Sequence, residues 1–273
     1  MSLADLADPA RLSPPDVEDL LGADETSERI LLLAEVALAQ AGASGLCPNY
    51  LNALRTALQD DPPYGGRAYC DSYRAASRDP VWMAASLLTN AHGEGEGATR
   101  LWSMAACAAD AEIRELLKQH AVDESGHAMF YLSFVDLALP GAISRDFRAE
   151  LRQLSPGYAM THKPFVVADS PYGRAPTIDD FVQVNIAEIR TTIHHLLQRR
   201  ALLEHAELAV HPRLVKTLDR LLGDELRHVG YTAMLVERLS ADVDPDRLVR
   251  LFCKRFSEFN ALTVDQLGQG VFD

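Results

Sequence analysis

Two short segments of the sequence share a pattern of residues that can bind metal ions. VDESGHAMFY covers residues 122–131, GDELRHVGYT covers residues 223–232, and each contains Asp-Glu-x-x-His. No other Glu-x-x-His occurs in the chain. On a helix, residues three apart lie on one face, so the Glu and the His of each motif can reach one ion. The candidate ligands from the two motifs are Glu124, His127, Glu225 and His228.

A site of this kind needs further carboxylates from other helices. In one type of four-helix bundle, two helices each supply Glu-x-x-His and two more each supply one Glu. We therefore expect one additional glutamate on the helix that precedes each motif. Glu188 is the only glutamate in the body of the helix predicted over residues 178–204, which makes it the candidate for the second motif.

The candidate for the first motif comes from the segment NAHGEGEGATR, residues 90–100, which contains two glutamates. If the segment is helical, Glu94 shares its face with an apolar stripe of Leu87, Ala91, Ala98, Leu101 and Ala105. Glu96 shares its face with the polar residues His92, Arg100 and Ser103. We select Glu94 as the ligand and keep Glu96 as the alternative.

The three glycines around these glutamates permit other interpretations. A phosphate-binding loop is disfavoured, because it would place two carboxylates beside an anion and because no strand precedes it. We expect a helix, in spite of a cost of about 1 kcal/mol for each interior glycine. The glycines would let a neighbouring helix, a substrate or dioxygen approach Glu94 closely, and a local π-bulge is an alternative.

Helix signals dominate the rest of the chain, and strand signals are nearly absent. Asp79-Pro80 and Asp244-Pro245 each place a capping residue before a proline at the first helical position, and Thr177 with Asp180 resembles a capping box. The predicted helices cover residues 27–42, 49–59, 80–107, 110–138, 178–204, 212–240 and 245–266, with a short one at 143–154. The long connection over 139–177 can join parallel helices of a bundle.

These elements predict an all-α protein with a single domain over residues 1–273. The metal-binding bundle is expected over residues 80–240, with a helical N-terminal extension over 1–79 and a C-terminal helix over 241–273. The fold expected is a four-helix bundle with a long crossover and additional helices at both ends.

Composition excludes several classes of function. The net charge of −13 leaves no basic stripe for a nucleic acid. The four cysteines form no CxxC pair, so a zinc knuckle or a disulfide framework is not expected. The most apolar segment is interrupted by Glu35 and is too short to cross a bilayer, and the N-terminus has no signal-peptide pattern. A cytoplasmic protein without membrane contact is therefore expected.

With its order Glu, Glu-x-x-His, Glu, Glu-x-x-His, the chain resembles the ferritin-like di-iron carboxylate superfamily over about residues 80–240. That group includes the ribonucleotide reductase small subunit, bacterial multicomponent monooxygenases, aldehyde-deformylating oxygenase and the p-aminobenzoate N-oxygenases. The resemblance implies a ferritin-like fold and two iron ions. The six ligands that it implies are Glu94, Glu124, His127, Glu188, Glu225 and His228.

The resemblance also assigns roles to residues beside the ligands. Asp123 and Asp224 match aspartates that accept a hydrogen bond from a ligand histidine on another helix and so orient its ring. The N-oxygenases add a histidine four residues before the last Glu, where this chain has Leu221. His120 and His195 lie on faces where an additional ligand fits, although a core role is the more common one.

Tyr131 matches the position of the radical tyrosine in the reductase small subunit, although a packing role is the more common one for a single tyrosine on an apolar face. The function implied by the resemblance is a dioxygen-dependent di-iron monooxygenase or oxidase. It would hydroxylate, N-oxygenate or desaturate a small organic substrate with electrons from an external donor such as a ferredoxin and its reductase.

Two other functions remain open: an iron-storage or ferroxidase protein, and a di-manganese enzyme with the same ligands. A homodimer is compatible with either. The aromatic residues of the crossover, Tyr158, Phe165 and Tyr172, are expected to cover the bundle, as suits an enzyme that excludes water from its substrate.

Overall fold

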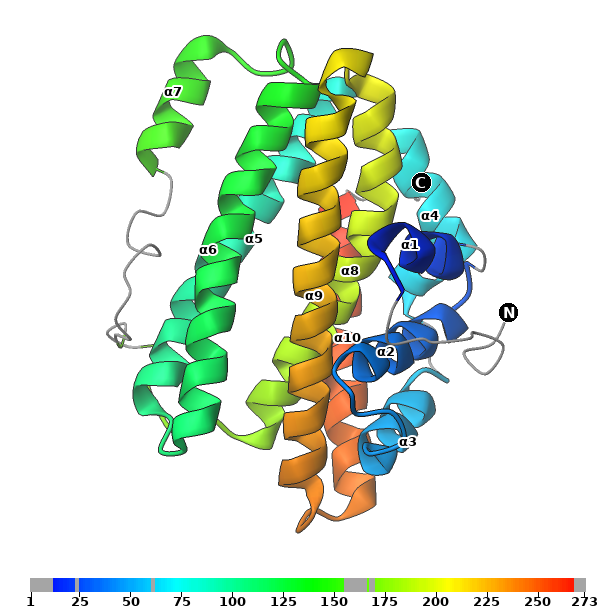
Figure 1. The fold of residues 1–273 in the computed structure, drawn as a ribbon, viewed down its shortest axis with the longest axis vertical. Coiled ribbons are helices and arrows are strands. Elements are labelled where there is room, and N and C mark those ends of the chain that lie inside the picture. Colours follow the sequence, from blue (N-terminus) through cyan, green and yellow to red (C-terminus); the bar gives the residue numbers. More distant parts are fainter. Residues whose placement is uncertain (1–11, 23–24, 60–61, 155–165, 167–169, 268–273) are drawn as a thin grey trace. The chain divides into compact units, whose positions relative to one another are not determined.

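The computed structural model describes residues 12–22, 25–59, 62–154, 166 and 170–267. Within these ranges every regular element is a helix and no strand occurs, which confirms the predicted all-α helical bundle (Figure 1). Tyr158 and Phe165, which we expected to cover the bundle, lie outside the described residues.

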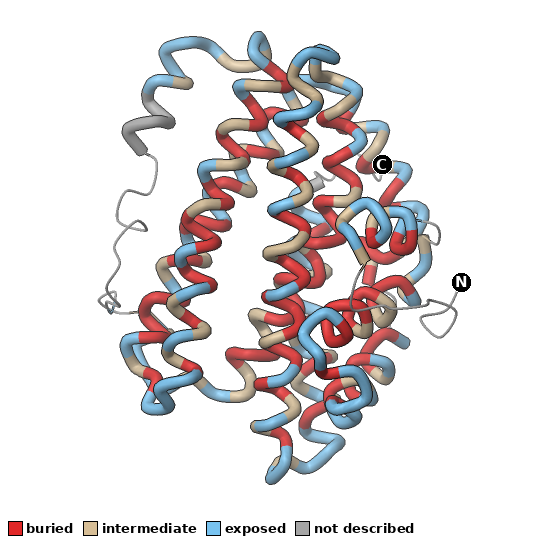
Figure 2. The backbone as a smooth tube through the Cα atoms, in the orientation of Figure 1, coloured by how far each residue is buried: buried red, intermediate tan, exposed pale blue. Residues whose placement is uncertain are grey.

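The four longest helices begin and end within one residue of the predicted positions. They are α5 (Pro80–Cys107), α6 (Ala111–Ala138), α8 (Ile178–His205) and α9 (His211–Ser240). The remaining predicted helices are also present, as α2 (Glu28–Gln40), α3 (Pro48–Ala57), α7 (Arg145–Leu154) and α10 (Pro245–Leu267). Buried and exposed residues alternate along α6 and α9, as expected for helices with one covered face (Figure 2).

Capping side chains explain several of these boundaries. The Asp79 carboxylate accepts a hydrogen bond from the backbone N–H of Val81 at 2.9 Å, which starts α5. Asp180 accepts from both the backbone N–H and the hydroxyl of Thr177, at 2.7 and 2.8 Å, at the start of α8. The capping interactions predicted at Asp79-Pro80 and at Thr177 are therefore confirmed.

Two helices were not predicted: α1 (Pro14–Gly22) and α4 (Arg67–Ala76). The two prolines at the start of α1 suggested a break, but proline is compatible with the first helical turn. Ser13 completes the start of α1, because its backbone N–H donates to the Asp16 carboxylate at 2.9 Å. In α4 the buried residues Tyr69, Cys70 and Tyr73 share one face of a short helix whose sequence is mostly polar.

The chain divides into two compact units, and each is described separately. Unit 1 comprises residues 1–76, 177–200 and 218–273, and unit 2 comprises residues 77–176 and 201–217. The first Asp-Glu-x-x-His motif belongs to unit 2 and the second belongs to unit 1. The predicted organisation, with one domain over 1–273 and a bundle over 80–240, stays a prediction.

Unit 2 is built on the antiparallel pair α5 and α6, which lie side by side in Figure 1. The glycine-rich segment is part of α5, which is α-helical from Pro80 to Cys107, so the alternative of a π-bulge is wrong. Beyond α6, α7 is held by Arg148, whose Nε and Nη2 each donate to the Asp136 carboxylate at 2.6 Å. From the crossover, the Tyr172 ring lies 5.7 Å from the Arg100 guanidinium of α5.

Unit 1 contains the parts of α8 and α9 that carry the second motif, together with α1 to α4 and α10. Helix α2 lies unusually close to α9: a Cβ atom at Gly230 would come within 2.9 Å of the Ala37 carbonyl oxygen. Arg199 on α8 forms ion pairs with Glu18 of α1 at 2.7 Å and with Asp219 of α9 at 2.6 Å. The second motif is thus embedded in several layers of helix.

Candidate metal centre

Unit 2 brings three of the predicted ligands together. Donor atoms of Glu94, Glu124 and His127 all lie within 4.8 Å of one another, and all three residues are buried. His127 Nδ1 lies 3.4 Å from Glu124 Oε1. Two carboxylates and one imidazole in this arrangement can hold a metal ion. We refer to this group as half-site 2.

The two candidate glutamates of α5 lie in different environments. Glu94 is 9% exposed and belongs to half-site 2. The Glu96 side chain is half exposed and pairs with His92 at 3.6 Å and with Arg100 at 3.4 Å. The structure thus places Glu94, and not Glu96, beside the first motif, while its role as a ligand stays a prediction.

One of the three glycines lies directly against half-site 2. A Cβ atom at Gly97 would lie 3.5 Å from Glu124 Oε2, which is an ordinary contact, whereas one at Gly93 would have no neighbour within 4 Å. Any larger side chain at position 97 would extend toward the Glu124 carboxylate, which is itself buried.

The Glu124 carboxyl is strongly stabilised as an anion. Burial by itself would raise its pKa. Hydrogen bonds with Glu94, His120 and His127 outweigh the burial and hold the pKa of Glu124 well below its usual range. A charged carboxylate is the form that binds a cation.

Unit 1 brings together the ligands predicted from the second motif. His228 Nδ1 lies 3.6 Å from Glu188 Oε2 and 3.6 Å from Glu225 Oε2. All three residues are buried, and Glu225 is completely so. We refer to this group as half-site 1. In both units, the Glu and the His of the motif lie near a glutamate from the preceding helix.

Each half-site also contains a second histidine. His120 Nε2 lies 3.3 Å from Glu124 Oε1 in unit 2. His195 Nε2 lies 3.3 Å from Glu225 Oε1 in unit 1. Both rings are almost fully buried. The two histidines named from the sequence therefore contact a candidate ligand, and their role as ligands stays a prediction.

The aspartates of the two motifs have different surroundings. Asp123 is buried and accepts hydrogen bonds from the Gln119 amide at 3.1 and 3.3 Å. Asp224 is paired with Arg227 at 2.8 Å and with Arg220 at 3.7 Å. Their expected hydrogen bond with a ligand histidine on another helix stays a prediction.

A buried network beside half-site 1 was not predicted. Asn185 is fully buried on α8, one turn before Glu188. Its amide donates to the Val229 carbonyl at 3.1 Å and to the Thr232 hydroxyl at 2.9 Å, and its Oδ1 accepts from the Tyr50 hydroxyl at 2.9 Å. The only sequence signal is an amide three residues before Glu188, on the same helix face.

Aromatic rings follow both motif histidines at the same spacing. The Phe130 ring lies 6.1 Å from that of His127, and the Tyr231 ring lies 6.4 Å from that of His228. Tyr131 is fully buried and packs edge-on against Phe134 at 5.9 Å. Its packing accounts for its burial, and its role as a radical site stays a prediction.

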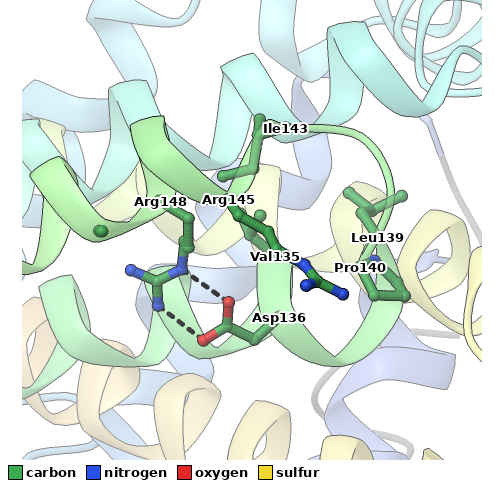
Figure 3. Close-up of a pocket in the computed structure, with 8 residues that line it drawn as sticks. Val135, Asp136, Leu139, Pro140, Ile143, Arg145 and Arg148 are labelled. Carbon is green, nitrogen blue, oxygen red and sulfur yellow. Dashed lines mark hydrogen bonds and ion pairs between the residues drawn. The ribbon is translucent and has the colours of Figure 1, made fainter.

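A cavity of about 300 Å³ in unit 2 lies apart from half-site 2 (Figure 3). It opens between the end of α6 and the start of α7, and the Asp136–Arg148 ion pair lies at its wall. Its apolar lining comes from Val135, Leu139, Pro140 and Ile143. The lining includes no candidate ligand.

Comparison with known proteins adds no assignment: no family model, no curated protein and no solved structure matches the chain. Among the described helices, none has an apolar stretch long enough to cross a membrane. The donor chemistry therefore has to identify the site. The four buried glutamates would carry a charge of −4 when all are ionised, and two divalent cations would neutralise that charge. Without cations, such a set would be strongly destabilising in a low-dielectric interior.

Proposed function

We propose that this protein is a ferritin-like non-haem di-iron oxygenase or oxidase that uses dioxygen to hydroxylate, N-oxygenate or desaturate a small organic substrate. The observation that carries the proposal is the pair of buried half-sites, each with two glutamates and the histidine of its motif. That the two half-sites hold their ions as one dinuclear centre is inferred from the ligand order in the sequence.

The ligand types favour iron. Neutral imidazole suits iron and other transition metals, and carboxylates suit hard cations. When bound, two iron ions would supply dioxygen binding and electron transfer to it. Electrons would come from a separate donor such as a ferredoxin and its reductase.

The chain's own residues would fix the ligands and admit the substrate. The depressed pKa of Glu124 keeps its carboxylate ready to bind a cation at neutral pH. Glycine at position 97 keeps side-chain atoms away from that carboxylate, since a Cβ there would lie 3.5 Å from Glu124 Oε2. The half-buried rings of Phe130 and Tyr231 lie next to ligand histidines, which favours an apolar or aromatic substrate.

The test is to load the metal-free protein anaerobically with Fe(II), to count the bound iron and to mix the complex with dioxygen. We expect about two irons per chain and a transient visible absorption. The matched control is Glu225→Ala, which should show neither. Excess Fe(II) is then added in air. Uptake of hundreds of irons into a large particle would contradict the oxygenase and establish iron storage instead.

A further inference from the structure

We propose that His120 and His195 are metal ligands, so that the two half-sites together offer four glutamates and four histidines to their ions. This inference rests on the proposed function, because it concerns the same centre. It changes the expected donor set from four glutamates and two histidines to four glutamates and four histidines.

In unit 2, two imidazoles approach the same carboxylate oxygen. Glu124 Oε1 lies 3.3 Å from His120 Nε2 and 3.4 Å from His127 Nδ1. His120 lies four residues before Glu124, and His127 lies three residues after it. All three side chains are at most 5% exposed. Both nitrogens therefore lie beside an oxygen that would bind an ion.

In unit 1, the two imidazoles approach different oxygens of one carboxylate. His195 Nε2 lies 3.3 Å from Glu225 Oε1, and His228 Nδ1 lies 3.6 Å from Glu225 Oε2. His195 reaches Glu225 from α8, whereas His228 lies on the same helix as Glu225. The Glu225 carboxylate therefore has a ring nitrogen beside each of its oxygens.

The distances also fit ligands of one ion. A charge-assisted hydrogen bond between a ring N–H and a carboxylate is about 2.7–2.9 Å long. Two donors on one ion, each at about 2.1 Å, are separated by roughly 3.0 Å at a right angle and 3.4 Å at a tetrahedral angle. The separations of 3.3 Å at His120 and His195 fall within the second range, and at His195 the same distance also allows a long hydrogen bond to Glu225.

The additional histidines make the two ions inequivalent. His120 lies four residues before Glu124, and the corresponding position before Glu225 is the buried Leu221. His195 lies seven residues after Glu188, and the corresponding position after Glu94 is the buried Leu101. The additional histidine of half-site 2 therefore lies on α6, which carries the first motif. That of half-site 1 lies on α8, the helix that precedes the second motif. The nitrogen-rich set also shifts the preference from manganese toward iron.

X-ray absorption of the Fe(II)-loaded full chain tests the inference without any mutation. Four histidines on two ions give an average of about two imidazoles per iron, whereas the two motif histidines alone give about one. An average of two is the expected result. A protein that binds two irons with one imidazole each would overturn the inference and leave the proposed function intact. A protein that binds no iron would contradict both the inference and the proposed function.

Variants assign the nitrogens to residues. We expect His120→Ala and His195→Ala each to lower the average to about 1.5 imidazoles per iron. Each should also weaken Fe(II) binding by more than about 100-fold, since losing only a residue that orients a ligand costs about 10–100-fold. His195→Gln keeps a hydrogen-bond donor to Glu225. Wild-type imidazole count and affinity in His195→Gln would show a positioning role and overturn the inference. The control is His92→Ala, whose side chain is 77% exposed.

Discussion

Half-site 1 and half-site 2 contain the same kinds of ligand but are supported in different ways. Behind half-site 1, α2 packs against the backbone of α9 at Gly230, and Asn185 ties α3, α8 and α9 together. Half-site 2 lies on the helix pair α5 and α6, and a Cβ at Gly97 would make only an ordinary contact with Glu124. The motif is therefore backed by close backbone packing at Gly230 in unit 1, whereas the contact at Gly97 in unit 2 is looser.

The aspartates of the two motifs also have different partners. Asp224, next to half-site 1, is neutralised by Arg227 and Arg220. Asp123, next to half-site 2, accepts from the Gln119 amide. The aspartate of the motif is therefore paired with two arginines at half-site 1 and contacts an amide at half-site 2.

The largest expected effect is the loss of metal when a predicted ligand of half-site 1 is removed. Glu225→Ala and His228→Ala should each reduce the bound iron from about two per chain to one or none. The measurement is metal analysis after anaerobic loading and desalting. Wild-type iron content in both variants would contradict the ligand assignment.

Dioxygen chemistry should depend on one of the two candidate glutamates of α5. Glu94→Ala should abolish the transient absorption with dioxygen, because Glu94 lies within 4.8 Å of Glu124 and His127. Glu96→Ala should leave most of it, because Glu96 forms ion pairs with the exposed residues His92 and Arg100. Stopped-flow absorption distinguishes them, and the reverse result would move the ligand to Glu96.

The close helix packing at half-site 1 predicts a stability effect. Gly230→Ala should lower the free energy of unfolding by about 1–3 kcal/mol, because the new methyl would overlap the Ala37 carbonyl. Urea denaturation of the metal-free protein measures it. Gly93→Ala is the control: its Cβ would meet nothing within 4 Å, and replacing a helical glycine should add about 0.5–1 kcal/mol. Equal stability of both variants would remove the distinction between the two helices.

The smallest effect on stability is expected at Gly97. At Gly97, an alanine Cβ would lie 3.5 Å from Glu124 Oε2, which is an ordinary contact. Gly97→Ala should therefore change the free energy of unfolding by no more than about 1 kcal/mol. If its midpoint of urea denaturation falls as far as that of Gly230→Ala, α5 is packed as closely as α9.

The sequence was informative about the helices because their signals are local. Asp79 and Thr177 act on backbone groups within three residues, so their effect can be predicted without the rest of the chain. Helix α1 was not predicted although its signal is also local: Ser13 and Asp16 flank two prolines, which are compatible with the first helical turn. The helices are set by short-range chemistry.

The site was predictable to the extent that it repeats a helical spacing. Glu124 with His127, and Glu225 with His228, follow from residues three apart on one face. The support of half-site 1 could not be predicted, because Asn185 meets partners 44 residues ahead and 135 residues behind it. The need for glycine at position 230 likewise depends on Ala37, a neighbour that no local pattern identifies.

The hydrogen bond between Tyr50 and Asn185 has a consequence for the order in which the protein is made. These partners are separated by 135 residues, so at about 5–20 residues per second α3 waits roughly 7–27 s on the ribosome for Asn185. During that time Glu94, Glu124 and His127 are synthesised together on the hairpin of α5 and α6. We expect that hairpin to resist proteolysis in arrested nascent chains in which α3 is still cleaved. Half-site 2 would then be the first place where the newborn chain can hold a metal ion.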